Sequence, residues 1–251
     1  MSTWMETTVE SVRHWHSGLL SLRINSPHFS FKAGQFARIG LPGNDGEPLA
    51  RAYSMVSAPG TETLEFVIAV VPDGDLSPRL AKLQAGDRIL LNSHPSGFFT
   101  LDHVPEGETL WLLATGTGIG PYLSILKGEQ VWQNFRRIRL VHGVRSSADL
   151  CYRDWLQALQ QKKPQQFYYQ PVLSREHHQH QPTMLHGRIP ALVDSGELEH
   201  ACKAVFNSQA QIMLCGNPAM IQDARTALKA KGLEKHLRRK PGNITMEQYW
   251  A

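Results

Sequence analysis

The chain has 251 residues, of which 41% are hydrophobic and 19% are charged, a composition typical of soluble globular proteins with one large or two ordinary domains. Lysine and arginine number 26 against 22 acidic residues, so the formal net charge is only +4. This excess is too small to indicate nucleic-acid binding by itself, and it suits an acidic protein partner equally well. We find no apolar run of signal-peptide or membrane-spanning length, and therefore expect no membrane segment.

The three cysteines, Cys151, Cys202 and Cys215, are an odd number and contain no CxxC pair. They therefore predict no disulfide framework, no zinc knuckle and no plant-type iron–sulfur centre. We expect a cytoplasmic protein with reduced thiols. Any redox chemistry would then use a bound organic cofactor or an external iron–sulfur partner.

The first part of the chain, residues 1–101, consists of short apolar runs separated by turn residues. Strands are predicted over residues 18–24, 34–41, 51–57, 63–71 and 87–93. Strands spaced so closely favour an antiparallel barrel or sandwich. One helix is predicted within "LSPRLAKLQAG", with Ser77 as its N-cap, Pro78 at its first position and Gly86 at its end.

The pattern changes at Thr109, where buried strands begin to alternate with helical segments. The strands are predicted at 109–114, 138–144, 167–173 and 211–216, and the helices at 121–135, 148–161 and 217–232. This alternation indicates a parallel sheet covered on both faces. We place the boundary in "DHVPEGE", residues 102–108, so that the two domains are residues 1–101 and 102–251.

The predicted parallel strands are followed by residues suited to a phosphorylated ligand. The first strand runs into "TGTGIGP", the second into Val144-Arg145, the third into Ser174-Arg175, and the last into Cys215-Gly216-Asn217-Pro218. Ligands of open parallel sheets collect outside the carboxyl ends of the strands. An arginine after the second strand would suit a 2′-phosphate, although Arg145 and Arg175 would also be ordinary as solvated loop residues.

In the first domain, "RAYSMVSAP" brings together the charge of Arg51, the aromatic face of Tyr53 and the hydroxyl of Ser54. Within four residues these groups suit a phosphorylated aromatic ligand. From the residues alone, an edge strand that happens to carry an arginine is the alternative.

Eight motifs occur along the chain in this order: "RAYS", "PDGDLSPRL", "GFF", "TGTGIGPYLSIL", "VLSRE", "GRIPAL", "LCGNPAM" and "HLRRKPGNITMEQYW". Together they resemble the bacterial, FAD-containing ferredoxin(flavodoxin)–NADP reductases, and the resemblance covers essentially the whole chain. The "YW" near the end is similar to one bacterial subclass. The resemblance implies an antiparallel β-barrel FAD domain followed by an α/β parallel-sheet NADP domain, with the tail 241–251 returning to the FAD site.

The resemblance also implies which residues bind FAD. Arg51 would contact the pyrophosphate, Tyr53 would lie against the isoalloxazine ring, and Ser54 would lie near flavin N5. The other positions implied for FAD are Ala52, Val67, Ile68, Ala69, Asp75, Leu76, Ser77 and Thr117. Asp75 would contribute only its backbone, because its carboxylate would repel a pyrophosphate.

For NADP(H), the resemblance assigns Arg145, Arg175 and Arg188 to the 2′-phosphate of the adenosine. Cys215 would lie near nicotinamide C4 and would not act as a covalent nucleophile. The other implied NADP positions are Val144, Ser174, Gly216 and Asn217.

The tail is implied to cover the flavin. Tyr249 would stack on the second face of the ring and would move away when nicotinamide binds, and Trp250 would lie on the adenine. Ala251 extends the chain beyond that tryptophan. Without the resemblance, the aromatic end is an anchor on the core. The expected catalytic residues are Ser54, Cys215 and Tyr249, with Glu247 as a weaker candidate.

The implied activity is hydride transfer between NADPH and FAD, coupled to single-electron exchange with ferredoxin or flavodoxin, in a monomer without nucleic-acid partners. The basic run Lys235, Arg238, Arg239 and Lys240 would dock an acidic carrier, or would be a solvated face. Rival functions are an NAD(P)H:flavin reductase, the reductase of an oxygenase, and a flavin-binding redox sensor. The histidines of "REHHQHQP" (His177, His178 and His180) are interpreted as a solvated loop, and no metal is expected.

Overall fold

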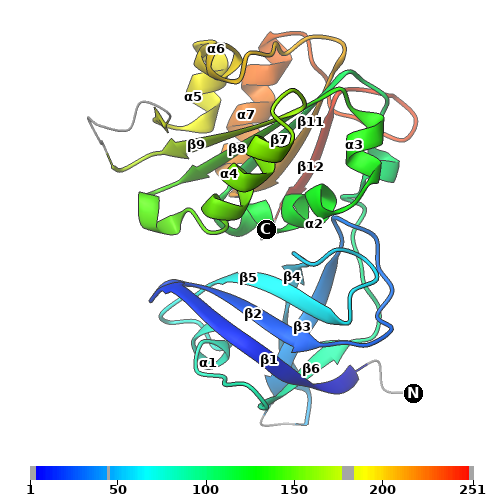
Figure 1. Ribbon diagram of the computed structural model, residues 1–251, viewed down its shortest axis with the longest axis vertical. Coiled ribbons are helices and arrows are strands. Elements are labelled where there is room, and N and C mark those ends of the chain that lie inside the picture. Colours follow the sequence, from blue (N-terminus) through cyan, green and yellow to red (C-terminus); the bar gives the residue numbers. More distant parts are fainter. Residues whose placement is uncertain (1–3, 44–45, 177–183, 249–251) are drawn as a thin grey trace. The chain divides into compact units, whose positions relative to one another are not determined.

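In a computed structural model, residues 4–43, 46–176 and 184–248 are described, and the chain divides into two compact units (Figure 1). The barrel unit comprises residues 1–101 and 120–128, and the sheet unit comprises residues 102–119 and 129–251. The segment 120–128 thus packs with the barrel unit although it follows the first strand of the sheet unit. None of the helices formed by the described residues is long and apolar enough to cross a membrane.

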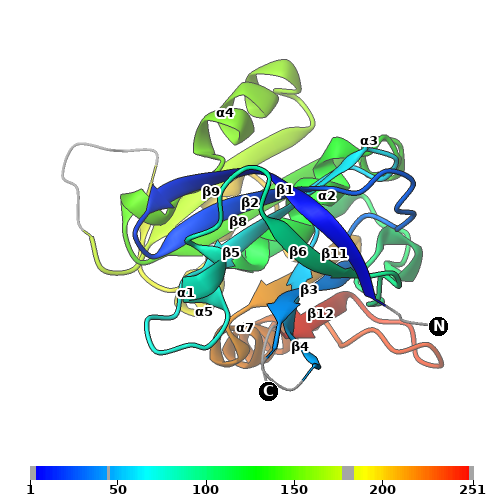
Figure 2. The same ribbon diagram turned by 90° about the horizontal axis from the view of Figure 1, so that it is seen from below.

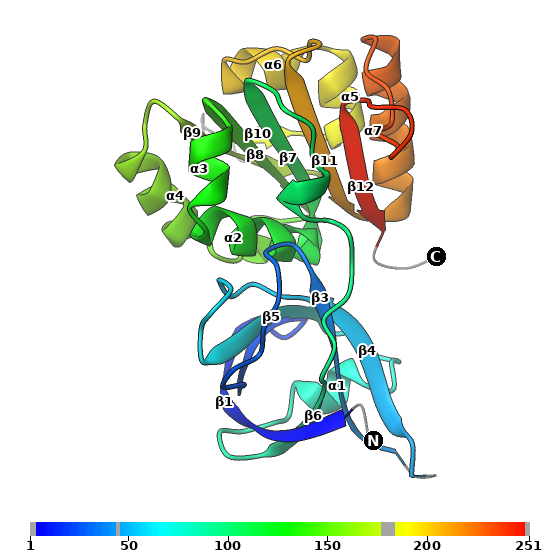
Figure 3. The ribbon, with the colours of Figure 1, turned by 90° about the vertical axis from the view of Figure 1, so that its right-hand side faces the viewer.

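The barrel unit is built on one antiparallel sheet of six strands. Its strands are β1 Trp4–His16, β2 Leu19–Asn25, β3 Phe36–Pro42, β4 Pro48–Ser54, β5 Thr63–Ala69 and β6 Arg88–Asn92, in the order β4-β3-β6-β1-β2-β5. The two outer strands meet where Met55 bridges Phe66 and the Val56 N–H donates to the Glu65 carbonyl at 2.7 Å. This pairing closes the sheet into the expected barrel, whose curvature is visible in Figure 3.

Strand β1 was not predicted from the sequence, although it is the longest strand of the barrel unit (Figure 2). Its residues 4–8 pair with β6, and its residues 9–16 pair with β2. Only Val9 of the strand is buried. Because both faces carry mostly polar residues, the alternation that identifies a half-buried strand is missing.

The predicted helix after β5 was wrong in extent and in its cap. The helix α1 is a single turn, Ser77–Leu80. Ser77 lies inside it, and its hydroxyl accepts a hydrogen bond from the Val71 N–H at 2.9 Å instead of capping the helix. Gly86 lies in the following turn with φ of +93° and donates its N–H to the Val9 carbonyl at 2.9 Å, so it does not end the helix.

The sheet unit contains a parallel sheet of six strands in the order β10-β9-β8-β7-β11-β12. They are β7 Thr109–Thr115, β8 Arg137–Val144, β9 Phe167–Leu173, β10 Leu185–His186, β11 Ala210–Gly216 and β12 Ile244–Gln248. Four of them were predicted, whereas β10 has only two residues and β12 is a short run of mixed polarity. The chain proceeds outward from β7 to β10 and then returns to β11 on the other side of β7. The carboxyl ends of β7 and β11 therefore form the switch point at which open α/β sheets bind ligands.

The helices are shorter and more numerous than the sequence predicted. They are α2 Gly120–Lys127, α3 Gln130–Asn134, α4 Arg153–Lys162, α5 Ile189–Asp194, α6 Glu197–Cys202 and α7 Pro218–Ala230. The single helix expected over 121–135 is interrupted around Gly128, and the helix expected from residue 148 begins only after a 3₁₀ turn at Ser147–Asp149. Within the sheet unit, α5, α6 and α7 pack on one face and α3 and α4 lie on the other (Figure 3).

Candidate functional site

The segment "RAYS" forms the C-terminal part of β4, which stands at one end of the strand order of the barrel sheet. Within β4, Arg51 and Ala52 are exposed and Ser54 is buried. Half-buried Tyr53 packs against the barrel core, and this burial raises the pKa of Tyr53 to about 12, with Arg51 acting in the opposite direction. The phenol is therefore neutral at working pH.

The hydroxyl of Ser54 is buried and, among the described residues, has no hydrogen-bond partner. A buried polar group without a partner costs roughly 1–3 kcal/mol, so such atoms are rare unless a ligand satisfies them. The guanidinium of Arg51 donates to the Ala50 carbonyl at 3.0 Å and, within the described part of the chain, forms no ion pair. A free cation and an unsatisfied hydroxyl on one strand fit the pyrophosphate and the polar ring edge of a flavin dinucleotide.

The other residues expected to bind FAD lie on the neighbouring strand β5 and in the turn before α1. Val67 and Ile68 are buried in β5, and Ala69 is exposed at its end. Leu76 is buried, whereas Asp75 is exposed. The start of α1 offers few backbone donors to a phosphate, because Pro78 has no N–H and the N–H groups of Arg79 and Leu80 donate to the Leu76 carbonyl at 2.9 and 3.0 Å.

At the switch point of the sheet unit, two loops pack backbone against backbone. Gly216 has φ of +128°, and a Cβ there would lie 2.3 Å from Thr115 Oγ1. A Cβ on Gly118 would lie 2.6 Å from the carbonyl oxygen of Cys215. Thr115 Oγ1 also accepts a hydrogen bond from the Asn217 N–H at 2.9 Å. Only glycine permits this approach, so close packing explains Gly118 of "TGTGIGP" and Gly216 of "CGNP".

Helix α7 starts at this point. The Asn217 side chain caps it by accepting hydrogen bonds from the Ala219 and Met220 N–H groups at 2.9 and 3.3 Å. Thr117 lies half-buried in the 3₁₀ turn Gly116–Ile119 that follows β7.

His142 in β8 is a residue of this region that the sequence analysis did not single out. It is fully buried, and its Nε2 lies 3.0 Å from the Gly116 carbonyl oxygen. Burial lowers the pKa of His142 to about 4, against a weaker opposing effect of the hydrogen bond to Gly116 and of Asp149. The ring is therefore neutral, with Nε2 donating, and Nδ1 has no partner in the described part of the chain. A histidine inside the apolar run "IRLVHGV" was the available signal.

Cys215 and Glu247 are paired in register across β11 and β12, both within the sheet unit. Cys215 is completely buried. Glu247 Oε2 is buried and accepts no hydrogen bond from the residues that the structure describes, and desolvation raises the pKa of Glu247 to about 7. Cys215 and Glu247 are each the penultimate residue of their strand, close to the switch point.

Three adjacent strands of the sheet unit end in the expected nucleotide residues. Beyond β8 and β9 the pairing continues, because the Ser174 N–H donates to the Val144 carbonyl at 2.9 Å and the Arg175 N–H donates to the Arg145 carbonyl at 3.0 Å. Arg188 follows β10, at the start of α5. All three arginines are exposed and form no ion pair with the described residues.

Glu176, which was not predicted as a site residue, orders the loop that follows Arg145. The Glu176 carboxylate accepts hydrogen bonds from the backbone N–H and the hydroxyl of Ser147, the latter at 3.1 Å. Asp149 closes a capping box with Ser146, whose N–H donates to it at 2.9 Å. Both acids thus accept hydrogen bonds from neutral donors of the loop that follows Arg145. The remaining predicted residues, Tyr249, Trp250 and Ala251, and the histidines 177, 178 and 180, lie outside the described residues.

Comparison with known proteins agrees with both halves of this description. Residues 10–100 match the oxidoreductase FAD-binding domain family, and residues 112–226 match the oxidoreductase NAD-binding domain family. The flavodoxin/ferredoxin–NADP reductases of Shigella flexneri and Escherichia coli are each 46% identical over the full length of both chains. The crystal structure of a ferredoxin NADP+ reductase from Neisseria gonorrhoeae with bound FAD and NADP superimposes with a TM-score of 0.94 over both complete chains at 36% identity. The chain therefore belongs to the flavodoxin/ferredoxin–NADP reductase family.

Proposed function

We propose that this protein is an FAD-dependent reductase that moves electrons between NADPH and a one-electron carrier, ferredoxin or flavodoxin. The observation that carries the proposal is the 46% identity to flavodoxin/ferredoxin–NADP reductases over the whole of both chains. Two features support it independently: within the described parts of the chain, the buried Ser54 hydroxyl has no hydrogen-bond partner and the strand-end arginines form no ion pair. When bound, FAD would exchange a hydride equivalent with NADPH and single electrons with the carrier.

In the barrel unit, we assign Arg51 to the FAD pyrophosphate, because a guanidinium forms paired, charge-assisted hydrogen bonds to phosphate oxygens. Tyr53 offers a neutral aromatic face for the ring system. Ser54 would satisfy its buried hydroxyl on the polar edge of that ring. Thr117, from the sheet unit, remains a proposed contact of the flavin.

In the sheet unit, we assign Arg145, Arg175 and Arg188 to the 2′-phosphate, which distinguishes NADPH from NADH. Val144 and Ser174 carry the backbone that holds the first two arginines together. Gly216 and Asn217 would receive the nicotinamide ribose at the start of α7. Cys215 would then be a neighbour of the reacting ring, and Glu247, poised near neutrality, could hold or release a proton there.

We further propose that the carrier docks on the basic turn formed by residues 235–240. Leu237 and Lys240 exchange backbone hydrogen bonds of 3.0 and 2.9 Å, so that Arg238 and Arg239 lie at the tip of a closed turn. All four of these residues are exposed. An ordered, exposed cationic tip would attract an acidic carrier over a distance set by the ionic strength.

The roles of Tyr249 as a movable cover on the flavin and of Trp250 as a partner of the adenine are also part of the proposal, together with the Tyr-Trp subclass. Strand β12 ends at Gln248, directly before these two residues. The three cysteines are buried and form no disulfide, which supports a location in the reducing cytoplasm, and we propose a monomer.

Two measurements test the proposed function. Mixing the FAD-loaded protein with NADPH in a stopped-flow instrument should bleach the flavin within seconds, and the reduced protein should then reduce ferredoxin or flavodoxin. A flavin that NADPH leaves oxidised would indicate a redox sensor. Rapid reduction of free flavin with no turnover of either carrier would indicate a flavin reductase.

A further inference from the structure

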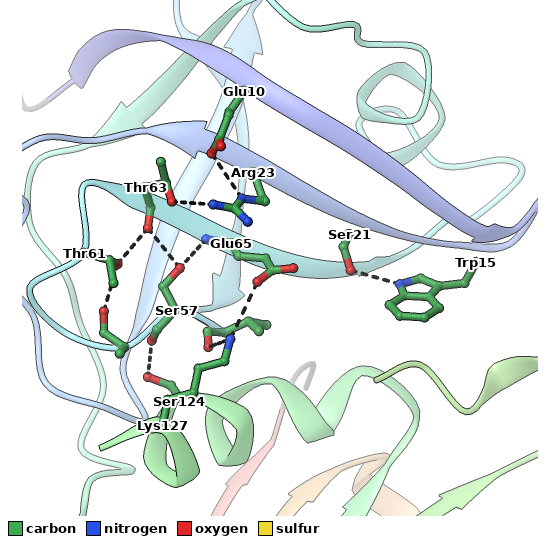
Figure 4. Close-up of polar contacts among 12 residues, drawn as sticks. Glu10, Trp15, Ser21, Arg23, Ser57, Thr61, Thr63, Glu65, Ser124 and Lys127 are labelled. Atoms are coloured by element: carbon green, nitrogen blue, oxygen red, sulfur yellow. Dashed lines mark hydrogen bonds and ion pairs between the residues drawn. The ribbon is translucent and has the colours of Figure 1, made fainter. Parts of the chain in front are cut away.

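Helix α2, Gly120–Lys127, lies in the barrel unit and packs along the segment that follows Ser54 (Figure 4). Every residue of the helix from Gly120 to Leu126 is buried. At its start, a Cβ on Gly120 would lie 3.4 Å from Val67 Cγ1 and 3.5 Å from Ser54 Cβ, which is ordinary contact distance. The first residue of α2 therefore packs beside the serine expected to face the flavin.

One turn further along α2, Ser124 holds the backbone of Ser57. The Ser124 hydroxyl is buried and donates to the Ser57 carbonyl at 2.6 Å. The Ser57 side chain is itself fixed, because its hydroxyl donates to the Thr63 carbonyl at 3.0 Å and accepts from the Glu65 N–H at 2.8 Å. Ser57 is thus tied to β5 on one side and to α2 on the other.

The last residue of α2, Lys127, holds the preceding carbonyl. Its Nζ donates to the Val56 carbonyl at 2.9 Å and lies 3.7 Å from Glu65 Oε2. The side chains of Lys127 and Glu65 are only 25% and 18% exposed. Burial lowers the pKa of Lys127, and Glu65 acts against this shift. The Lys127 ammonium is thus largely removed from solvent and donates to a specific backbone carbonyl, so this contact has a defined geometry.

Ser124 and Lys127 thus provide hydrogen-bond donors for two consecutive backbone carbonyls, those of Val56 and Ser57, which lie beyond the end of strand β4. The chain leaves β4 at Ser54, and the Val56 N–H returns to the ladder by bonding the Glu65 carbonyl at 2.7 Å. The carbonyls of Val56 and Ser57 are then bonded by α2 side chains, three residues apart on one face of the helix. The backbone between Ser54 and Ser57 is consequently held by β4 on one side and by the contacts of Val56 and Ser57 with β5 and α2 on the other.

We propose that Ser124 and Lys127 are positioning residues of the flavin site, which hold the Val56 and Ser57 carbonyls and thereby fix the backbone that aims the Ser54 hydroxyl. This inference rests on the proposed function, since it assigns Ser54 to the flavin. It differs from a purely stabilising role because it predicts an effect on the flavin that loss of stability alone would not produce.

The test compares Ser124→Ala and Lys127→Met with a matched control, Lys231→Met. Lys231 is also 25% exposed and pairs with Glu199 at 2.7 Å, but it lies in the sheet unit. Thermal melts report the stability that each variant loses. Hydrogen exchange of the apoprotein reports order over residues 52–58, and visible circular dichroism of the loaded protein reports the setting of the flavin.

We expect Ser124→Ala and Lys127→Met to increase exchange over residues 52–58, to change the flavin dichroism, and to slow flavin reduction at saturating NADPH. The slowing should be on the order of tenfold, because small displacements of positioned groups cost up to about a hundredfold. The Kd for NADPH should stay constant. Lys127→Arg should restore most of the rate, and Lys231→Met should change only the melting temperature.

The inference is overturned if the α2 variants melt like Lys231→Met while exchange over 52–58, flavin dichroism and reduction rate all match the unmodified protein. It is also overturned if the rate falls without any local change in exchange. A failure of the proposed function gives a different result, because the unmodified protein would then not be reduced by NADPH at all.

Discussion

Replacing Arg145 and Arg175 together by alanine should abolish most of the preference for NADPH over NADH. Neither guanidinium forms an ion pair with the described residues, so the substitutions break no salt bridge seen in the structure. The fold at this edge depends on backbone hydrogen bonds between the two loops, which alanine retains. The expected loss is therefore a loss of phosphate contacts.

The magnitude follows from the chemistry of the lost contacts. A hydrogen bond to a charged group contributes about 1.5–3 kcal/mol. Removal of two arginines should then cost about 3–6 kcal/mol towards NADPH, which is on the order of a hundredfold or more in kcat/KM, since about 1.4 kcal/mol is tenfold. NADH lacks the phosphate, so its kcat/KM should change little.

The assay measures kcat/KM for both nucleotides with a small neutral quinone as acceptor. Arg136→Ala serves as the control, because this exposed arginine lies just before the opposite end of β8 and pairs with Glu108 on the surface. An unchanged ratio of the two kcat/KM values in the double variant would refute the assignment. Equal losses for both nucleotides would place the arginines on a part of the ligand that NADH shares.

Three further results are expected. Neutralising Arg238 and Arg239 should slow reduction of an acidic carrier, with a weaker dependence on salt, and should leave quinone reduction unchanged; equal losses with both acceptors would point to misfolding. His142 remains neutral in the fold down to about pH 4, whereas the unfolded chain binds a proton near pH 6.5, so its contribution to stability is present above pH 6.5 and is lost as the pH falls towards 4. His142→Asn should flatten this acid limb in melts from pH 4 to 7, and an unaltered limb would show that other groups cause it. Tyr249→Ser should strengthen the charge-transfer band between oxidised NADP and the flavin, whereas Trp250→Ala should raise the FAD dissociation constant. If the band of Tyr249→Ser is unchanged, the tail serves only as an anchor.

Much of the fold was predictable because the residues repeat with clear periods. The buried runs "TLWLLA" and "QIMLCG" could be assigned to parallel strands from length and composition, and the structure contains them as β7 and β11. Strand β1 escaped prediction because its pairing with two neighbours leaves only Val9 buried. Its hydrogen bonds are made by the backbone, which the sequence pattern does not report.

Single residues suited to ligand binding could be identified in the sequence, whereas the residues that hold their surroundings in place could not. Arg51, Arg145 and Cys215 stand at strand ends or in motifs that the sequence displays. His142, Glu176 and Lys127 instead contact backbone atoms of residues that are distant in the sequence. Their partners are Gly116, Ser147 and Val56.

 Separations of 26, 29 and 71 residues are too long for any local pattern to display.

The motif "TGTGIGP" spans the boundary between the two units, because Ile119 belongs to the sheet unit and Gly120 to the barrel unit. Gly118 is required by its close approach to Cys215 in the sheet unit, whereas Gly120 opens a helix that packs on Ser54 in the barrel unit. One short motif therefore supplies the packing of the switch point and the start of the helix that packs beside Ser54, the serine proposed to face the flavin. A substitution at Gly118 should then disturb the Cys215 loop first, and a substitution at Ser124 should disturb the Ser54 segment first, although only six residues separate them.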